Sequence, residues 1–178
     1  TDMDLAIVEH TAAEVAGAGA ATVPAHMLYD IVRKLPEGAQ VQLELAGDGS
    51  QVAIKAGRSR FTLQTLPKED FPSTASGDLP HRFPLSAVDL RSLIDHTRFA
   101  ISTEETRYYL NGIYLHAHSS GKQQALRAVA TDGHRLARVE MPLPEGAEKI
   151  PGVIVPRKTV GEVRKLLEEV DGAVEVSL

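Results

Sequence analysis

The segment TDGHRLARVE at residues 131–140 repeats, with one residue inserted, the segment TDMDLAIVE at residues 1–9. A second pair follows in the same order, since VPAHMLYDIVRKL at residues 23–35 is matched by VPRKTVGEVRKLL at residues 155–167. The offset between copies is 130 residues for the first pair and 132 for the second. Two ordered matches at nearly one offset indicate a structural unit of about 130 residues that is written twice.

Neither copy of the unit is complete within the chain. Residues 81–130 precede the second Thr-Asp pair, but no counterpart precedes Thr1. Residues 47–80 follow the first block, and they have no counterpart after Leu178. The chain also begins at threonine rather than methionine, so we expect it to be part of a longer protein.

Composition excludes several classes of protein. The 178 residues are 43% hydrophobic, enough for a core, and they include no cysteine, which excludes disulfide frameworks and thiolate metal sites. No stretch of about 18 apolar residues predicts a membrane span, and no signal peptide opens the chain. We expect a cytoplasmic protein with no membrane contact.

Hydrophobic periodicity predicts an α+β unit with antiparallel hairpins. Strict alternation is typical of strands, and apolar residues at every third or fourth position are typical of helices. Ser86 and Asp89 resemble a capping box at the start of a helix. The predicted helices cover residues 25–35, 86–97 and 157–169, and the predicted strands cover 41–45, 51–55, 60–66, 107–117, 124–130, 134–140 and 153–155.

Charge is distributed unevenly over these elements. When the middle helix is taken to residue 98, the three helices carry a net charge of +2, which leaves −7 on the rest of a chain whose total is −5. Solvated helix faces commonly carry Lys and Arg, and that is one interpretation. The other is a basic helical surface on an acidic body, which would hold nucleic acid through backbone electrostatics.

The TDGHRL segment allows three interpretations. His134 could be a general base oriented by Asp132, as in a hydrolase. The first copy has Met3 and Asp4 where the second has Gly133 and His134, and no Ser or Cys nucleophile motif accompanies the pair, so we expect no catalysis. The alternatives are a turn that leads into a strand and a binding role for that turn.

Histidines and tyrosines give two further hypotheses. His116 and His118 face one side of a predicted strand and could join His134 at a metal, but no carboxylate cluster with ligand spacing accompanies them. We expect no metal and no cofactor. Tyr108 and Tyr109 should point to opposite faces of a strand, one into the core and one toward a partner or a sugar-phosphate backbone.

Four strings carry a resemblance to a known family: GRSRFTLQTLPKEDFP (57–72), RYYLNGIYL (107–115), ATDGHRLARVEMP (130–142) and VIVPRK (153–158). In order and spacing they resemble the bacterial DNA polymerase III beta subunit, the sliding clamp family. The resemblance implies repeated α+β domains with antiparallel sheets outside and helices lining a ring. Residues 1–75 would then be the later part of a first domain, 76–80 a linker, and 81–178 the earlier part of a second domain.

The resemblance also implies a function. The family is a non-catalytic processivity factor in DNA replication: a homodimeric ring encircles duplex DNA without sequence specificity and tethers the polymerase. Polymerase and clamp-loader subunits bind through short peptide motifs. The alternatives are a repeat-built peptide-binding module without a DNA role and the His/Asp hydrolase.

Residue roles follow from the resemblance by motif match. The peptide pocket, whose other wall belongs to a third domain, would comprise Leu110, Thr131, Gly133, His134, Arg135 and Leu136. The residues expected to touch DNA are Tyr108, Tyr109, Arg157 and Lys158. The edge strand that closes the ring against a neighbouring subunit would carry Arg58, Arg60, Phe61 and Leu63.

Overall fold

The computed structural model describes residues 5–72, 78–104, 106–121 and 123–178. The first four residues of the TDMD copy, positions 76 and 77 of the predicted linker, and Lys122 of a predicted turn lie outside the described residues. The chain divides into two compact units, Thr1–Thr74 and Ala75–Leu178. The division falls close to the place where the sequence predicts a linker.

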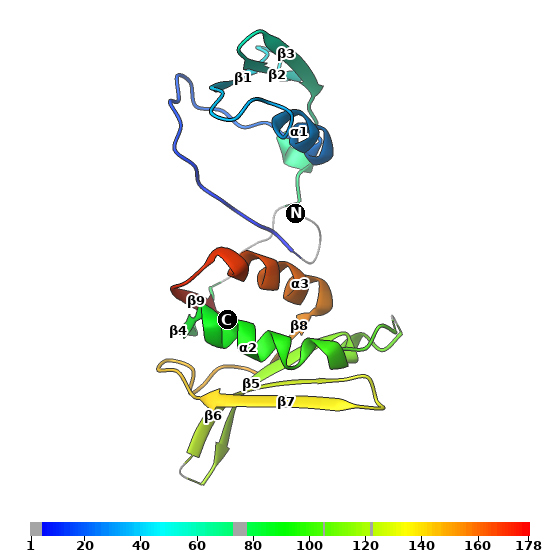
Figure 1. The fold of residues 1–178 in the computed structure, drawn as a ribbon, viewed down its shortest axis with the longest axis vertical. Helices are drawn as coiled ribbons and strands as arrows, with labels where there is room; N and C mark the ends of the chain where they lie inside the picture. The colour runs from blue at the N-terminus through cyan, green and yellow to red at the C-terminus, as the bar shows by residue number, and fades with distance from the viewer. Residues whose placement is uncertain (1–4, 73–77, 105, 122) are drawn as a thin grey trace. The chain divides into compact units, whose positions relative to one another are not determined.

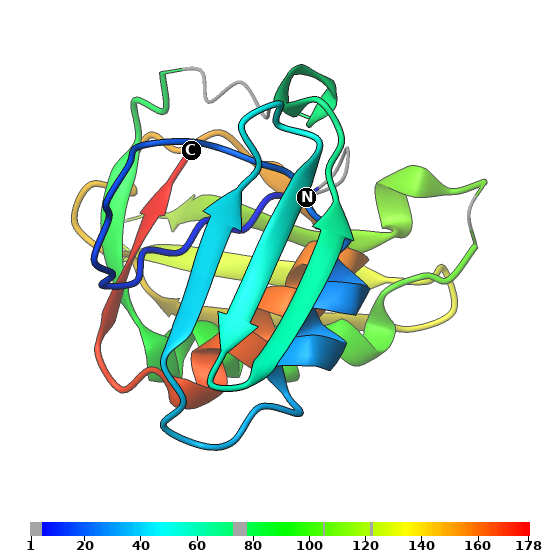
Figure 2. The same cartoon turned by 90° about the horizontal axis from the view of Figure 1, so that it is seen from above.

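The first unit is one helix on a small antiparallel sheet. The helix α1 spans Ala25–Val32, and the strands β1 (Val41–Leu45), β2 (Gln51–Ala56) and β3 (Ser59–Gln64) lie in the order β1-β2-β3 (Figures 1 and 2). The 3-10 turn η1 (Lys68–Asp70) follows. All three predicted strands are confirmed, since their alternation places every second side chain on one face.

The core of this first unit is small. Val52, Ile54 and Leu63 are buried, and Leu28 and Ile31 of α1 pack against them. The same face of the sheet continues on β1, where Val41, Leu43 and Leu45 are exposed. The helix therefore covers the β2 and β3 side of the sheet and leaves β1 uncovered among the described residues.

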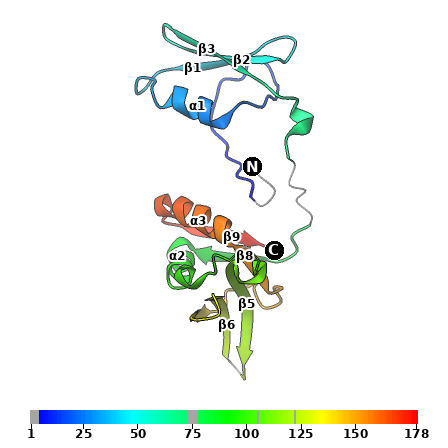
Figure 3. The same cartoon turned by 90° about the vertical axis from the view of Figure 1, so that its right-hand side faces the viewer.

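The second unit places two helices on one face of a four-stranded antiparallel sheet (Figures 1 and 3). The sheet order is β7-β6-β5-β8, and a separate pair joins β4 to β9. The strands are β4 (Arg82–Ser86), β5 (Gly112–Ser120), β6 (Gln123–Thr131), β7 (Leu136–Pro142), β8 (Val153–Pro156) and β9 (Ala173–Ser177). The helices are α2 (Ala87–Asp95) and α3 (Arg157–Leu166), with 3-10 turns η2 (Arg98–Ala100), η3 (Tyr108–Leu110) and η4 (Leu167–Glu169).

Local sequence signals set the N-terminal start of both helices in this unit. Ser86 caps α2: its hydroxyl accepts a hydrogen bond from the Asp89 backbone N–H at 3.0 Å and donates one to the Asp89 carboxylate at 2.6 Å. The predicted N-cap at Ser86 is therefore confirmed, and the Asp89 carboxylate closes it through the Ser86 hydroxyl. Pro156 precedes α3, where its fixed φ of −60° suits the helix start.

An ion pair joins the two helices across their contact. Arg164 on α3 donates from Nε to both carboxylate oxygens of Asp95 on α2, at 2.9 Å each. The Arg164 guanidinium lowers the pKa of Asp95, because it stabilises the charged carboxylate. Apolar packing lies beneath the pair, where Leu93 and Val160 are buried.

Several predicted bounds are wrong. The helices are shorter than predicted, because each gives way to a tighter turn after Val32, Asp95 or Leu166. The strand predicted over 134–140 begins at Leu136, since the residues before it form a turn.

Candidate functional site

The TDGHR segment is a rigid turn between β6 and β7. The Asp132 carboxylate accepts hydrogen bonds from the backbone N–H groups of His134 at 2.9 Å and Arg135 at 3.0 Å. The Thr131 hydroxyl accepts from Gly133 N–H at 3.1 Å and donates to the Arg135 carbonyl at 2.7 Å. Gly133 has φ +90°, which favours glycine. The predicted turn is confirmed.

The Asp132 carboxylate also holds the Arg135 side chain, which donates from Nε at 2.9 Å. The backbone N–H groups of Arg135 and His134 are the main cause that lowers the pKa of Asp132 to about 2. The carboxylate is thus ionised and fully engaged at neutral pH. Leu136 follows the turn with 64% of its surface exposed.

Leu110 belongs to a second segment that approaches this turn. A Cβ added to Gly133 would lie 3.3 Å from Nη1 of Arg107, so the two segments are in contact. The Arg107 carbonyl in turn accepts the Leu110 backbone N–H at 2.8 Å, and the Leu110 carbonyl accepts from Ser102 N–H at 3.0 Å. The structure brings the segments of the predicted peptide pocket together through Arg107 and Gly133.

The tyrosine pair corrects the prediction of a strand over residues 107–117. Tyr108 and Tyr109 lie in η3, and β5 begins only at Gly112. Both rings are exposed, at 79% and 56%, and pack edge to face 5.7 Å apart, so neither is a core residue. Pairing with β8 begins only at Gly112, where an added Cβ would meet the Val155 carbonyl oxygen.

Arg157 and Lys158 are exposed at the start of α3. The Arg157 backbone N–H donates to the Asn111 carbonyl at 2.9 Å, which ties the first residue of α3 to the residue that follows η3. One short segment, residues 107–111, therefore contacts both the turn and the helix start. The residues predicted to touch DNA and those predicted to bind peptide are connected through it.

The catalytic and metal hypotheses find no matching geometry. The Asp132 carboxylate accepts from backbone N–H groups and from Arg135, while the His134 ring is not among its partners. His116 and His118 do share one side of β5, with ring centres 6.2 Å apart. His116 pairs with Arg127, so the end of β6 at Thr131 lies about 13 Å farther along, and His134 follows in the turn beyond it. Among the described residues, no three potential ligands gather around a metal position.

The predicted interface strand is β3, an edge strand of the first sheet among the described residues. Arg58, Arg60 and Phe61 are exposed. Leu63 is 1% exposed because its side chain fills the core of its own unit. Leu63 can therefore contribute to a neighbouring strand through its backbone only.

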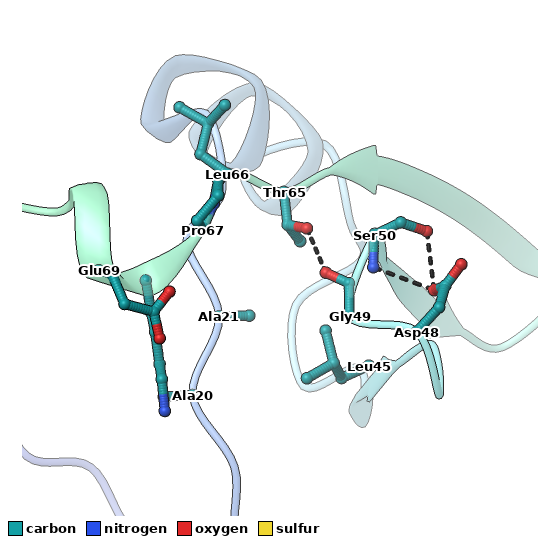
Figure 4. Close-up of a pocket in the computed structure, with 11 residues that line it drawn as sticks. Ala20, Ala21, Leu45, Asp48, Gly49, Ser50, Thr65, Leu66, Pro67 and Glu69 are labelled. Atoms are coloured by element: carbon teal, nitrogen blue, oxygen red, sulfur yellow. Dashed lines mark hydrogen bonds between the residues drawn. The ribbon is translucent and has the colours of Figure 1, made fainter.

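Two features of the structure were not predicted from the sequence. Phe99 on η2 lies under the Arg135 guanidinium, whose carbon is 5.7 Å from the ring centre. The first unit also contains an open polar hollow of about 480 Å³, in which the turn at Asp48, Gly49 and Ser50 faces the segment from Thr65 to Glu69 (Figure 4). Neither carries a motif, because each is formed by residues that are distant in the sequence.

An antiparallel sheet backed by two helices, joined to a unit whose helix and strands repeat part of that pattern, defines a repeat-built α+β protein with clamp-type domains. The sequence pattern of the DNA polymerase III beta subunit N-terminal domain matches residues 1–75, and that of the central domain matches residues 84–178. The chain belongs to the DNA polymerase III beta subunit family.

Similar proteins agree with this assignment. The beta sliding clamp of Caulobacter vibrioides is 54% identical over 178 residues, which are 100% of this chain and 48% of that protein. The crystal structure of the Caulobacter crescentus sliding clamp matches with a TM-score of 0.88 at 56% identity, over 93% of this chain and 44% of that one. A Bartonella birtlesii sliding clamp bound to griselimycin matches with a TM-score of 0.86 at 55% identity, over the same shares. The chain spans about half the length of these relatives.

No helix among the described residues is long and apolar enough to cross a membrane.

Proposed function

We propose that the complete protein containing this chain is a DNA sliding clamp, a non-catalytic processivity factor that encircles duplex DNA as a homodimer and tethers the replicative polymerase. The observation that carries the proposal is the match along the whole chain to a beta sliding clamp at 54% identity. Residues 1–75 are then the later part of a first domain, 76–80 a linker, and 81–178 the earlier part of a second domain. Two compact units that divide at residues 74 and 75 support this organisation.

The uncovered face of the first sheet supports the same proposal. Val41, Leu43 and Leu45 place apolar side chains in solvent on the face that α1 covers elsewhere. Exposed apolar patches of this kind mark surfaces that another element covers. Under the proposal, the rest of the first domain in the complete protein covers these three side chains.

The partners follow from the two faces of the second unit. Duplex DNA passes the exposed tyrosines of η3 and the start of α3, where Arg157 and Lys158 supply positive charge. Polymerase and clamp-loader subunits insert short peptide motifs beside Leu110 and the rigid turn from Thr131 to Leu136. Griselimycin, bound by the Bartonella birtlesii clamp, is a candidate ligand of the same site. The cytoplasm, where bacterial DNA is replicated, is the proposed location.

A charge-reversal experiment tests the DNA contact. In the complete protein, Arg157→Glu with Lys158→Glu should weaken equilibrium binding to short linear duplex DNA several-fold at low salt, because like charges then face the phosphates. The matched control reverses Arg138 and Lys149, two exposed cations of the same unit. Equal binding by both variants and the wild type would instead favour a peptide-binding module without a DNA role.

A further inference from the structure

The Phe99 side chain is exposed to solvent because buried neighbours fix the backbone on both sides of it. Thr97 and Ala100 on either side are fully buried, and the Ala100 N–H donates to the Thr97 carbonyl at 3.0 Å. The Phe99 ring between them is 57% exposed. A single exposed aromatic residue is common on protein surfaces. Phe99 is of interest because it lies under Arg135, a charged side chain of the proposed peptide site.

Arg135 is fixed from two sides. Asp132 accepts its Nε–H at 2.9 Å, and the Phe99 ring centre lies 5.7 Å from its guanidinium carbon, within the range of a cation–π contact. Among the described residues, the two terminal amino groups of Arg135 make no hydrogen bond, since its side chain donates through Nε. An arginine that is held in place with these groups unused is ready to donate to a ligand.

We propose that Phe99 is a positioning residue of the partner-peptide site. Phe99 and Asp132 together orient the Arg135 guanidinium, so that its two terminal amino groups donate to oxygen acceptors of the bound segment. The exposed Leu136 next to it receives an apolar side chain of that segment. The inference rests on the proposed function, because it requires that a peptide-like ligand binds at this turn.

Orientation matters because arginine has many rotamers. A guanidinium that swings freely must be ordered when the ligand binds, and that lost freedom weakens binding. Asp132 fixes Nε, but rotation of the remaining side chain is limited only by the ring below it. Replacing Phe99 with an aliphatic residue should therefore weaken binding, although Phe99 itself does not contact the ligand. Replacing it with another aromatic residue should preserve binding.

The test measures the Kd of griselimycin for the complete protein. Phe99→Leu should bind about twofold to fivefold more weakly than the wild type, the range expected for an exposed cation–π contact. Phe99→Tyr, which keeps the ring face, should bind as the wild type does. Phe71→Leu is the matched control, because it makes the same change at an exposed phenylalanine of the first unit.

A double-mutant cycle separates positioning from a structural effect. In an Arg135→Ala background, Phe99→Leu should cause no further loss of affinity, because the group that it positions is gone. Additive losses would overturn the inference, and so would wild-type affinity in Phe99→Leu. If the wild type itself does not bind griselimycin, the proposed peptide site falls and the inference falls with it.

Discussion

At the scale of single residues, the turn between β6 and β7 concentrates local constraints. Asp132 supplies acceptors to two backbone N–H groups and one side chain, Thr131 closes the loop, and Gly133 takes a positive φ. An Asx-type turn of this kind needs no contact from the rest of the molecule, so the Asp-Gly sequence predicts it well. Its rigidity makes it a pre-formed surface for a ligand.

Gly133→Ala should destabilise the second unit by about 1 kcal/mol or more. The left-handed backbone is strained for alanine, and the new Cβ would press on the Arg107 side chain. Gly161→Ala is the matched comparison, because Gly161 lies inside α3 with open space around it, and it should stabilise by roughly 0.5–1 kcal/mol. Denaturant unfolding measures both, and equal effects would contradict the strained turn.

The Asp132 carboxylate predicts a pH dependence of stability. Its pKa is about 2 in the folded protein against an ordinary value of 3.8. A lowered pKa contributes stability that is present above pH ~4 and lost as the pH falls toward 2. The free energy of unfolding should therefore fall over this window, and Asp132→Asn should flatten the fall. Denaturant unfolding across this window measures both proteins, and an equal fall in the two would contradict this contribution.

At the scale of elements, alternation predicted the strands well and composition predicted the tyrosine segment badly. The strands β1, β2 and β3 follow an alternation that only a sheet with one buried face explains. Tyr108 and Tyr109 have strand-like composition, but they form a 3-10 turn, and the packing of β5 on β8 begins only at Gly112. That packing is a tertiary contact, which the local sequence does not encode.

The same distinction applies to the candidate site. The turn at Asp132 and Gly133 was predicted because its geometry is local, and the family resemblance assigned its residues to the site. Phe99 was missed because it reaches Arg135 from 36 positions earlier in the chain, through the packing of η2 against β6 and β7. Arg107 appeared only within the RYYLNGIYL string, and its contact with Gly133 also depends on the fold.

The contact between α2 and α3 predicts a measurable coupling. A double-mutant cycle on Asp95 and Arg164, with Asn and Met as replacements, should give a coupling of about 0.5–1 kcal/mol, because both oxygens accept from a mostly covered arginine. The Glu162 and Lys165 pair on α3 is more exposed and should couple by less than about 0.5 kcal/mol. Equal couplings would contradict a helix contact fixed by the Asp95 pair.

At the scale of the whole molecule, the modest charge of the helices fits the proposed ring. The chain has a net charge of −5, which is unfavourable for tight binding to phosphates. A ring holds DNA by encirclement, so weak and non-specific contacts suffice. A tethered polymerase then gains processivity from a raised effective concentration at the template.

The most direct test of this account measures how long the complete protein stays on DNA of different topology. The protein is loaded onto circular plasmid, and retention is measured by gel filtration before and after a restriction enzyme linearises the DNA. The account predicts stable retention on the circle and loss from the linear form, because a ring slides off free ends. Retention that is unchanged by linearisation would contradict encirclement.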